Sequence, residues 1–249
     1  MVVGIDLGSR TIKLAVVRGG EIVDEQLVES GFDPCTQARG MLEKYGAEKI
    51  VATGYGRHLA REHFAHEVIT EIKAHALGAR YFFPLCRTVI DIGGQDSKVI
   101  GLDKDGRVSN FQMNDKCAAG TGRFLEIMAA SLGFRLNDFG AAALKSKTEV
   151  TINSMCTVFA ESEVISMKNR GIPAVDIAGA VHHSVVNRLA AMLERLGYEE
   201  EIVFSGGVAR NPCIGHMLRE RLGGRARIIS PAAPDLMGAV GAALYGLRS

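Results

Sequence analysis

Two eight-residue segments of this chain repeat one pattern, and the repeat constrains the fold more than any other feature of the sequence. Residues 6–13 read DLGSRTIK and residues 91–98 read DIGGQDSK, so each begins with Asp, has Gly at its third position and ends with Lys. Each segment follows a short apolar run and leads into another, which is typical of a β-hairpin. A hairpin repeated along the chain predicts a duplicated subdomain.

The residue types in the two turns suit a phosphate group. Glycine allows backbone N–H groups to approach an anion closely, and lysine supplies a positive charge. An aspartate at the end of a strand can hold a hydrated Mg²⁺ ion without entering its inner coordination shell. Two such turns that face each other would therefore hold a nucleoside triphosphate from both sides.

Length and charge narrow the alternatives. The chain has 249 residues, enough for two modest domains, with 29 Lys and Arg against 28 Asp and Glu. No basic run is long enough to follow a phosphate backbone, so we expect no nucleic-acid partner. No stretch approaches 18 consecutive apolar residues, and the first residues lack the pattern of a signal peptide. We therefore expect a cytoplasmic protein without a membrane span.

Apolar periodicity and turn residues predict the remaining elements. We expect further strands at residues 21–28, 49–53, 108–113, 201–204 and 226–229, and helices at residues 34–45, 57–64, 71–81, 122–132, 158–169, 174–196, 212–222 and 236–245. The last helix is rich in small residues, and we expect it to pack back on the first subdomain.

The two hairpins, the turn Ser205-Gly206-Gly207 after a strand and the helix that begins at Glu71 resemble the superfamily of sugar kinases, actin and heat-shock-chaperone ATPases. This resemblance implies an α/β fold, a duplicated ribonuclease-H-like ATPase with two lobes and mixed sheets. We expect residues 1–84 plus 235–249 to form the first ATPase lobe and residues 85–234 the second. The chain has no G-x-x-x-x-G-K-[ST] segment, which excludes a P-loop.

The resemblance also implies a site for ATP or ADP with Mg²⁺. Asp6 and Asp91 are the catalytic candidates that would hold the hydrated Mg²⁺. Glu71 is the candidate general base or water-orienting residue, with a surface helix carboxylate as the alternative. The residues expected to bind the nucleotide are Gly8, Ser9, Arg10, Thr11 and Lys13 in the first hairpin, Gly93, Gly94, Gln95, Asp96, Ser97 and Lys98 in the second, and Gly206 and Gly207 in the later turn.

Cys117 and Cys156 each stand just before a predicted helix, and Thr121 is expected to cap the helix that follows Cys117. A helix N-terminus favours a thiolate and accommodates an anionic metal–sulfur cluster. Two thiolates leave a four-coordinate cluster incomplete, whereas a two-fold axis between two chains doubles the ligand set. The alternative is that both are buried small hydrophobic residues. Cys35, Cys86 and Cys213 have no matching context and are interpreted as structural.

Residues 114–126, 154–166 and 91–98 narrow the resemblance. They are similar to the activator component, an ATP-dependent reductase, of 2-hydroxyacyl-CoA dehydratases, in the BadF/BadG/BcrA/BcrD-type ATPase family that includes benzoyl-CoA reductase subunits. This resemblance implies a homodimer with one [4Fe-4S] cluster between the subunits, held by Cys117 and Cys156 of each. It also implies an electron donor, ferredoxin or flavodoxin, and an acceptor, the dehydratase or a related double-cluster iron–sulfur protein. ATP hydrolysis would drive the transfer at low potential.

Two other functions remain open. A small-molecule kinase of the same fold would need a catalytic aspartate between the lobes, and Asp33 is the candidate that the first subdomain offers. A nucleotide-gated scaffold or filament would leave both cysteines unexplained. His58, His63, His66 and His75 fall in a polar helical region without paired metal-ligand spacing, and we interpret them as solvated or structural.

Overall fold

Two five-stranded mixed sheets with the same topology form the framework of the molecule. The computed structural model describes residues 1–154 and 156–248. The strand order is β3-β2-β1-β4-β5 in the first sheet and β10-β9-β6-β7-β8 in the second. In the first sheet β1, β2 and β3 pair antiparallel, and β4 and β5 add in parallel on the other side of β1. In the second sheet β6, β7 and β8 pair antiparallel, and β9 and β10 add in parallel on the other side of β6. The shared topology agrees with the duplicated α/β fold that the repeated hairpin predicts.

The strands are short and the helices lie mostly in the second half of the chain. The first sheet contains β1 (Val2–Leu7), β2 (Thr11–Arg18), β3 (Glu21–Glu29), β4 (Lys49–Thr53) and β5 (Glu67–Val68). The second contains β6 (Thr88–Ile92), β7 (Ser97–Leu102), β8 (Val108–Asn114), β9 (Glu201–Ser205) and β10 (Arg227–Ile229). The helices are α1 (Pro34–Leu42), α2 (Arg57–His63), α3 (Glu71–Phe82), α4 (Gly122–Leu132), α5 (Leu136–Ala143), α6 (Thr157–Asn169), α7 (Ala174–Leu196), α8 (Pro212–Arg221) and α9 (Met237–Gly246), with short 3₁₀ turns η1 (Gly207–Arg210) and η2 (Pro234–Leu236).

Both faces of the first sheet are covered, which explains the almost continuous apolar sequence of β1. Val3, Ile5 and Leu7 share a cluster with residues of α1 and α2 on one face. Val2 packs with residues of α9 on the other. Because successive side chains of a strand point to opposite faces, a strand buried on both sides needs apolar residues at nearly every position.

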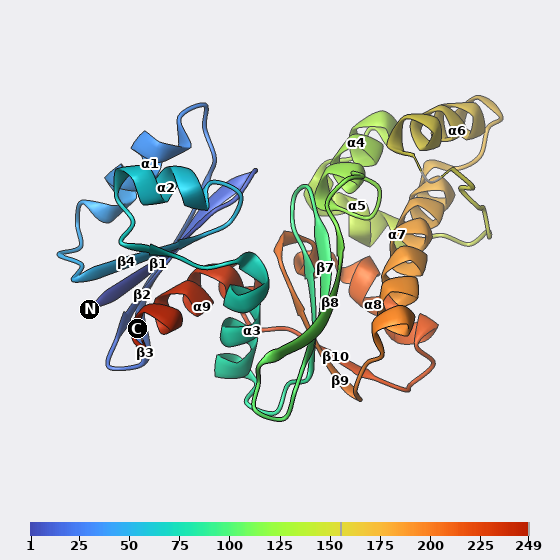
Figure 1. Cartoon of the computed structure of the whole chain (residues 1–249). Coiled ribbons are helices and arrows are strands. Elements are labelled where there is room, and N and C mark those ends of the chain that lie inside the picture. The colour runs from blue at the N-terminus through green and yellow to red at the C-terminus, as the bar shows by residue number, and fades with distance from the viewer. Residues whose placement is uncertain (155, 249) are drawn as a thin grey trace.

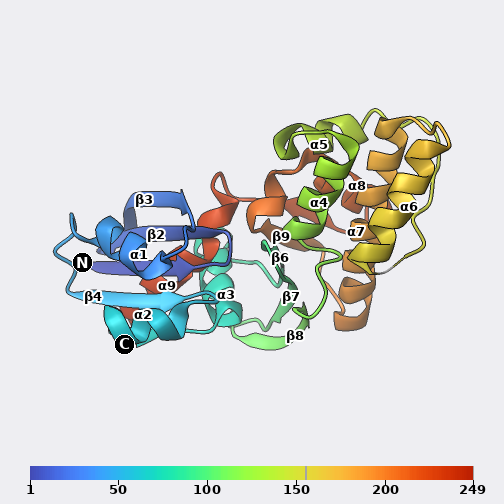
Figure 2. The same ribbon diagram turned by 90° about the horizontal axis from the view of Figure 1, so that it is seen from above.

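Helices α3 and α9 join the two sheets. Ala76 and Ala79 of α3 pack with Val89 and Ile100 of the second sheet, while α9 covers the first sheet. The layers therefore run from α1 and α2 through the first sheet, α9, α3 and the second sheet to α4–α8 (Figure 1). Seen from above, the lobes lie side by side with α3 and α9 between them (Figure 2).

The small residues of α9 allow its close approach to α3. A β-carbon at Gly241 would lie 1.7 Å from the carbonyl oxygen of Ala74, so the two backbones are nearly in contact there. The expectation that this helix packs back on the first subdomain is confirmed.

The structure differs from the sequence-based expectation in a few elements. Helix α5 and the two-residue strand β5 were not predicted, and α1 ends at Leu42 instead of residue 45. Thr121 stands at the N-cap of α4, but its hydroxyl donates a 2.6 Å hydrogen bond to the Ala118 carbonyl, so the expected side-chain cap does not form. The lobe boundaries at residues 84 and 234 stay predictions. None of the helices in the described ranges is long and apolar enough to cross a bilayer.

Candidate active site between the two sheets

The two repeated turns and the Gly206-Gly207 turn line one cavity of about 640 Å³ between the lobes. Of the predicted site residues, the cavity is lined by Asp6, Gly8, Ser9, Arg10, Thr11, Lys13, Glu71, Asp91, Gly93, Gly94, Gln95, Asp96, Gly206 and Gly207. Ser97 and Lys98 are outside the lining and fully buried. The structure thus brings together residues that are far apart in the sequence.

In the first hairpin an aspartate and a lysine neutralise each other. Asp6 at the end of β1 lies directly opposite Lys13 of β2, and the Lys13 Nζ atom is 3.0 Å from Asp6 Oδ2. Burial by itself lowers the pKa of Lys13, but the attraction of Asp6 outweighs it and the pKa is raised. Lys13 is therefore held as an ammonium ion beside the cavity.

The second hairpin repeats this pairing with more charge. Asp91 lies opposite Lys98, and the Lys98 ammonium is 2.6 Å from Asp96, 2.7 Å from Glu71 and 3.5 Å from Asp91. Burial lowers the pKa of Lys98, but Asp91, Glu71 and Asp96 together raise it above its usual range. The ammonium group is thus surrounded by three carboxylates.

Negative charge exceeds positive charge at this end of the cavity. Four carboxylates, those of Asp6, Glu71, Asp91 and Asp96, stand against the two ammonium groups of Lys13 and Lys98 and leave a formal excess of two negative charges. Such a surplus suits a divalent cation with bound water, because a triphosphate alone would be repelled.

His75 lines the cavity, although the sequence led us to interpret it as solvated or structural. It is buried, and its Nδ1 atom is 3.4 Å from Asp91 Oδ1 and 3.3 Å from the Ser205 hydroxyl. Burial raises the pKa of Asp91, but His75 and Lys98 lower it more, so the pKa stays below its usual value. The spacing of Glu71 and His75, four residues apart on one helix face, is the signal that could have identified it.

The turn after β9 requires glycine. Gly206 has φ +82°, and a β-carbon there would lie 2.3 Å from the Ile92 carbonyl oxygen and 2.7 Å from Asp91 Oδ1. Only glycine allows this approach of β9 to the end of β6. Beyond the turn the unpredicted helix α5 contributes Leu136 and Gly140 to the cavity wall.

Cys117 lies in a loop that is anchored on both sides. The Asn114 side-chain amide donates hydrogen bonds to the carbonyl oxygens of Cys117 and Ala119, at 2.9 and 3.0 Å. The Thr121 hydroxyl donates a hydrogen bond to the Ala118 carbonyl. Cys117 is half-buried, which leaves part of it accessible.

Cys156 occupies the N-cap position of α6 and is exposed. Its thiol therefore lies beside the positive end of a 13-residue helix. By contrast, burial raises the pKa of Cys86 to about 11 and that of Cys213 to about 12, which keeps both thiols protonated. Cys35 is also buried. The exposures agree with the separation of Cys117 and Cys156 from the structural cysteines.

The cysteine loop is joined directly to the second hairpin turn. The backbone N–H of Gly122 donates to the Gly93 carbonyl at 2.9 Å, and that of Arg123 donates to the Gly94 carbonyl at 2.8 Å. Helix α4 therefore begins on the turn that lines the cavity, five positions after Cys117. A displacement of the turn would move the start of this helix.

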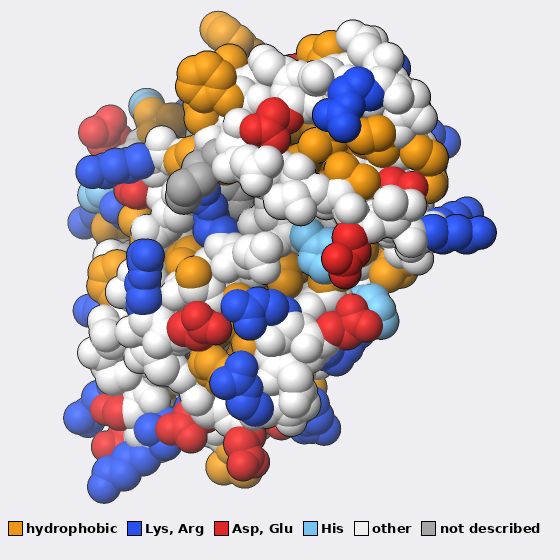
Figure 3. All heavy atoms as spheres, turned by 90° about the vertical axis from the view of Figure 1, so that its right-hand side faces the viewer, with side chains coloured by type: hydrophobic (Ala, Val, Ile, Leu, Met, Phe, Trp, Pro, Cys, Tyr) orange, Lys and Arg blue, Asp and Glu red, His pale blue; other side chains and the backbone are white. Residues whose placement is uncertain are grey.

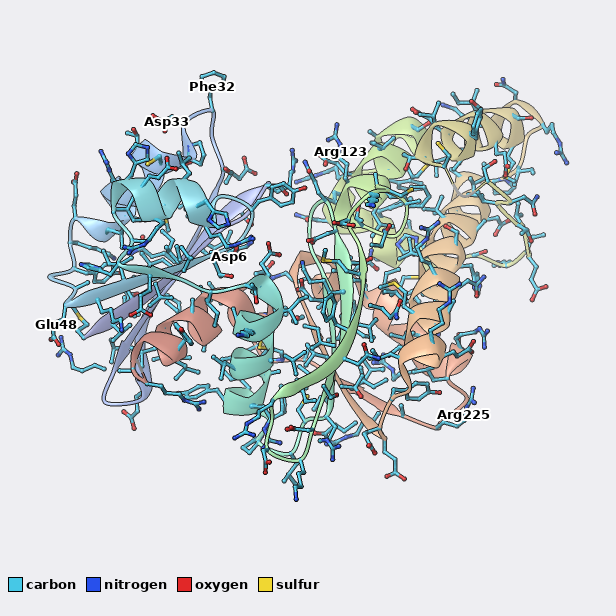
Figure 4. All side chains as sticks on the ribbon, in the orientation of Figure 1. Asp6, Phe32, Asp33, Glu48, Arg123 and Arg225 are labelled. Carbon is cyan, nitrogen blue, oxygen red and sulfur yellow. The ribbon has the colours of Figure 1, made fainter. Side chains whose placement is uncertain are left out.

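Asp33 has a structural role. Its carboxylate caps α1 by accepting hydrogen bonds from the backbone of Cys35 and Thr36 and from the Thr36 hydroxyl, and these bonds lower its pKa. It lies outside the cavity lining, at the outer end of the first lobe and away from Asp6 (Figure 4). Asp33 is therefore not placed to act as the catalytic aspartate that a small-molecule kinase would need.

The chain resembles proteins of one family along almost its whole length. It matches the model of the BadF/BadG/BcrA/BcrD ATPase family over residues 3–246. It is 42% identical over 251 residues to the 2-hydroxyisocaproyl-CoA dehydratase activator of Clostridioides difficile, covering 97% of this chain and 93% of the relative. It is 43% identical over 254 residues to the (R)-2-hydroxyglutaryl-CoA dehydratase activating ATPase of Acidaminococcus fermentans, covering 98% and 96%.

Solved structures of other proteins show the same similarity. The activator of the 2-hydroxyisocaproyl-CoA dehydratase from Clostridium difficile with bound ADPNP superposes with a TM-score of 0.90 at 39% identity, covering 99% of this chain and 94% of that one. A ROK family glucokinase from Streptomyces griseus, with a TM-score of 0.62 at 15% identity, shares the fold alone. Motifs, topology and whole-length similarity lead to one assignment: the chain belongs to the BadF/BadG/BcrA/BcrD ATPase family.

Proposed function

We propose that this protein is an ATP-dependent one-electron reductase that activates a 2-hydroxyacyl-CoA dehydratase or a related double-cluster iron–sulfur protein. Relatives named as activators of such dehydratases support the ATP-dependent activation. The observation that carries the proposal is the direct hydrogen bonding of the cavity turn to the helix that follows the Cys117 loop. It gives the nucleotide a short path to the loop that carries the half-buried Cys117.

The nucleotide part of the proposal assigns ATP or ADP to the interlobe cavity. The tips of the two hairpin turns, Ser9 and Arg10 in the first and Gly94 and Gln95 in the second, line the cavity and would face the phosphates. The Gly206-Gly207 turn would receive the nucleoside. The surplus of carboxylates fits a hydrated Mg²⁺ held in its outer shell by Asp6 and Asp91.

Glu71 is the proposed acid–base group for hydrolysis. Its carboxylate lines the cavity and is oriented by the Lys98 ammonium at 2.7 Å. A carboxylate fixed in this way can orient a water molecule for attack on a phosphate and accept its proton.

Cys117 and Cys156 of each of two chains would hold one [4Fe-4S] cluster. Four thiolates are the usual ligand set of such a cluster, and the group supplies one-electron transfer at low potential when it is bound. Among the described residues no group of three or more His, Cys, Asp or Glu side chains is arranged to hold a metal ion, so the ligands of a second chain are part of the proposal. Ferredoxin or flavodoxin is the proposed donor.

The surface around Cys156 supports a second copy as the neighbour. Val158 and Phe159, the residues that follow the start of α6, are 67% and 66% exposed, and Ile165 is 47% exposed. Apolar side chains are visible toward the top of the face that contains α6 (Figure 3). Large apolar side chains beside a proposed ligand are expected to be covered in a dimer.

The energy required is large for one helix. For a one-electron couple 59 mV corresponds to about 1.4 kcal/mol, so a drop of about 300 mV requires roughly 7 kcal/mol. Reorientation of a helix terminus contributes up to about 2 kcal/mol. Docking of the acceptor and exclusion of water would have to supply the rest. A redox titration with ADP and with a non-hydrolysable ATP analogue, in the presence of the acceptor, tests this, and equal midpoints would contradict it.

Metal analysis of protein purified without oxygen tests the ligand set. Wild-type protein should contain about two iron and two sulfide per chain, as a dimer with one shared cluster requires. Cys117→Ser and Cys156→Ser should each lose most of both, whereas Cys35→Ser, a matched change at a buried cysteine, should keep them. Iron-free wild-type protein that is still competent to activate a dehydratase would overturn the proposal.

A further inference from the structure

Arg10 connects the first hairpin to the helix that starts on the second. Its guanidinium Nη2 atom is 2.7 Å from Oε1 of Glu126, a residue of α4 that is 116 positions away in the sequence. The other Glu126 oxygen accepts a 2.9 Å hydrogen bond from Arg123. All three side chains line the interlobe cavity. Figure 4 shows Arg123 at the start of α4, on the side that faces the first lobe.

The stem of Arg10 also meets the second turn. A β-carbon at Gly94 would lie 2.5 Å from Arg10 Cγ and 3.3 Å from the Ser9 hydroxyl. The turns of the first and second hairpins therefore touch at this point. The Gly94 carbonyl accepts a hydrogen bond from the start of α4. Arg10 therefore contacts the second turn at Gly94 and also the helix that is bonded to this turn, at Glu126.

We propose that Arg10 and Glu126 form a latch between the first hairpin and α4, and that a nucleoside triphosphate opens it by taking the Arg10 guanidinium from the carboxylate. The Arg10 side chain is 54% exposed and that of Glu126 is 29% exposed, so the ion pair is weak enough to be exchanged. A phosphate group accepts two parallel hydrogen bonds from a guanidinium and carries more charge than a carboxylate.

Opening of the latch changes what holds α4. In the structure, α4 is attached to the first hairpin through Glu126 and to the second through Gly122 and Arg123. With a triphosphate, the first attachment is lost and the second remains. Arg10 and Glu126 are thus positioning residues that make the placement of α4 depend on the ligand in the cavity. The inference rests on the nucleotide site of the proposed function and is independent of the metal cluster.

Removal of the competing carboxylate should tighten nucleotide binding. Calorimetric titration with a non-hydrolysable Mg–ATP analogue should give a dissociation constant about two- to fivefold lower for Glu126→Gln than for wild type, which is the range expected for an exposed ion pair. Glu194→Gln removes the same charge from an exposed helical ion pair with Arg221, outside the cavity lining, and should leave the constant unchanged.

The double variant assigns the effect to Arg10. In an Arg10→Gln background, the change of Glu126 to Gln should no longer improve affinity, because the group that the carboxylate held is gone. An unchanged or weaker affinity of Glu126→Gln, or a gain that persists without Arg10, would overturn the latch while leaving the nucleotide site in place. Failure of every variant and of wild type to bind the analogue would overturn both.

Discussion

At the scale of single residues, the site depends on charges that are satisfied inside the protein. Lys98 is 1% exposed, and its ammonium contacts three carboxylates, those of Asp91 and Asp96 in the second hairpin and that of Glu71 at the start of α3. The sequence predicted that an Asp and a Lys would stand at equivalent places in two turns, because a hairpin fixes which residues face each other. It did not predict that Glu71 of α3 completes the arrangement, since that contact depends on how α3 packs against the second sheet.

Replacement of Lys98 by Gln should destabilise the nucleotide-free protein by about 3–5 kcal/mol, because three carboxylates lose the buried ammonium group that they share. Lys44→Gln, in an exposed pair with Asp24, should cost about 1 kcal/mol or less. The deficit of the Lys98 variant should shrink as the pH falls from 7 to 5, since protonation of the carboxylates relieves their repulsion. Denaturant unfolding measures both, and a deficit as small as that of Lys44→Gln would contradict this account.

Glu71→Gln should bind ATP normally and hydrolyse it about 10²- to 10⁴-fold more slowly, because the amide cannot accept a proton from water. Steady-state turnover measured together with equilibrium binding separates the two effects. Glu62→Gln, an exposed residue of α2, is the control and should hydrolyse ATP at the wild-type rate. A turnover of Glu71→Gln close to wild type would assign the carboxylate a structural role.

At the scale of elements, local pattern and tertiary contact divide the predictions. The long helix α7 and the strands that carry the turns follow from their periodicity, and their bounds are close to the expected ones. Helix α5 has eight residues and no side-chain cap, and its Gly140 is required because a β-carbon there would lie 2.4 Å from Asn211 Oδ1. A helix this short forms because it packs against α7 and α8, and its local sequence contains no signal that predicts it.

The contact of α9 with α3 makes a sharp prediction about glycine. Gly241→Ala places a methyl group against the Ala74 carbonyl and should destabilise the protein by about 1–3 kcal/mol or more. Gly40→Ala, in α1 with no heavy atom within 4 Å of the new methyl, should instead stabilise by about 0.5–1 kcal/mol through helix propensity. Thermal unfolding of both variants tests the assignment, and equal shifts of the two would argue against close backbone contact.

At the scale of the whole molecule, stability in mild acid depends on a histidine that joins three helices. His182 of α7 is fully buried against Phe139, its Nδ1–H donates to the Ala178 carbonyl, and its Nε2 accepts from the Asn211 amide. The Asn211 side-chain amide cannot flip, because its oxygen accepts the hydrogen bonds that cap α8. Burial lowers the pKa of His182 to about 4, so folding requires the neutral ring.

The sign of the resulting pH dependence follows from the lowered pKa. The stability contributed by neutral His182 is present above the unfolded-state pKa near 6.5 and is lost as the pH falls toward the folded-state pKa. Between pH 7 and 5 the free energy of unfolding should fall by about 2 kcal/mol from this group. His182→Gln, which can still accept from Asn211, should remove that part of the slope, whereas His216→Gln at an exposed position should not. Identical slopes for wild type and His182→Gln would contradict the assignment.

The duplication itself was the most predictable property of the molecule, because the repeated turn is encoded in adjacent residues. The cavity could be placed from the two turns, but its walls could not, since α5 and His75 enter it through packing between distant segments. The same limit applies to the proposed latch: the sequence placed Arg10 among the expected nucleotide-binding residues but did not pair it with Glu126, which is 116 positions away.

One face of the first sheet is sealed by α9, which follows the second sheet along the chain. As the polypeptide leaves the ribosome, the opening strands must wait, with that face uncovered, until the entire second lobe has been synthesised. The first sheet is therefore covered on this face only after α9 has been synthesised and has packed over β1 and β2.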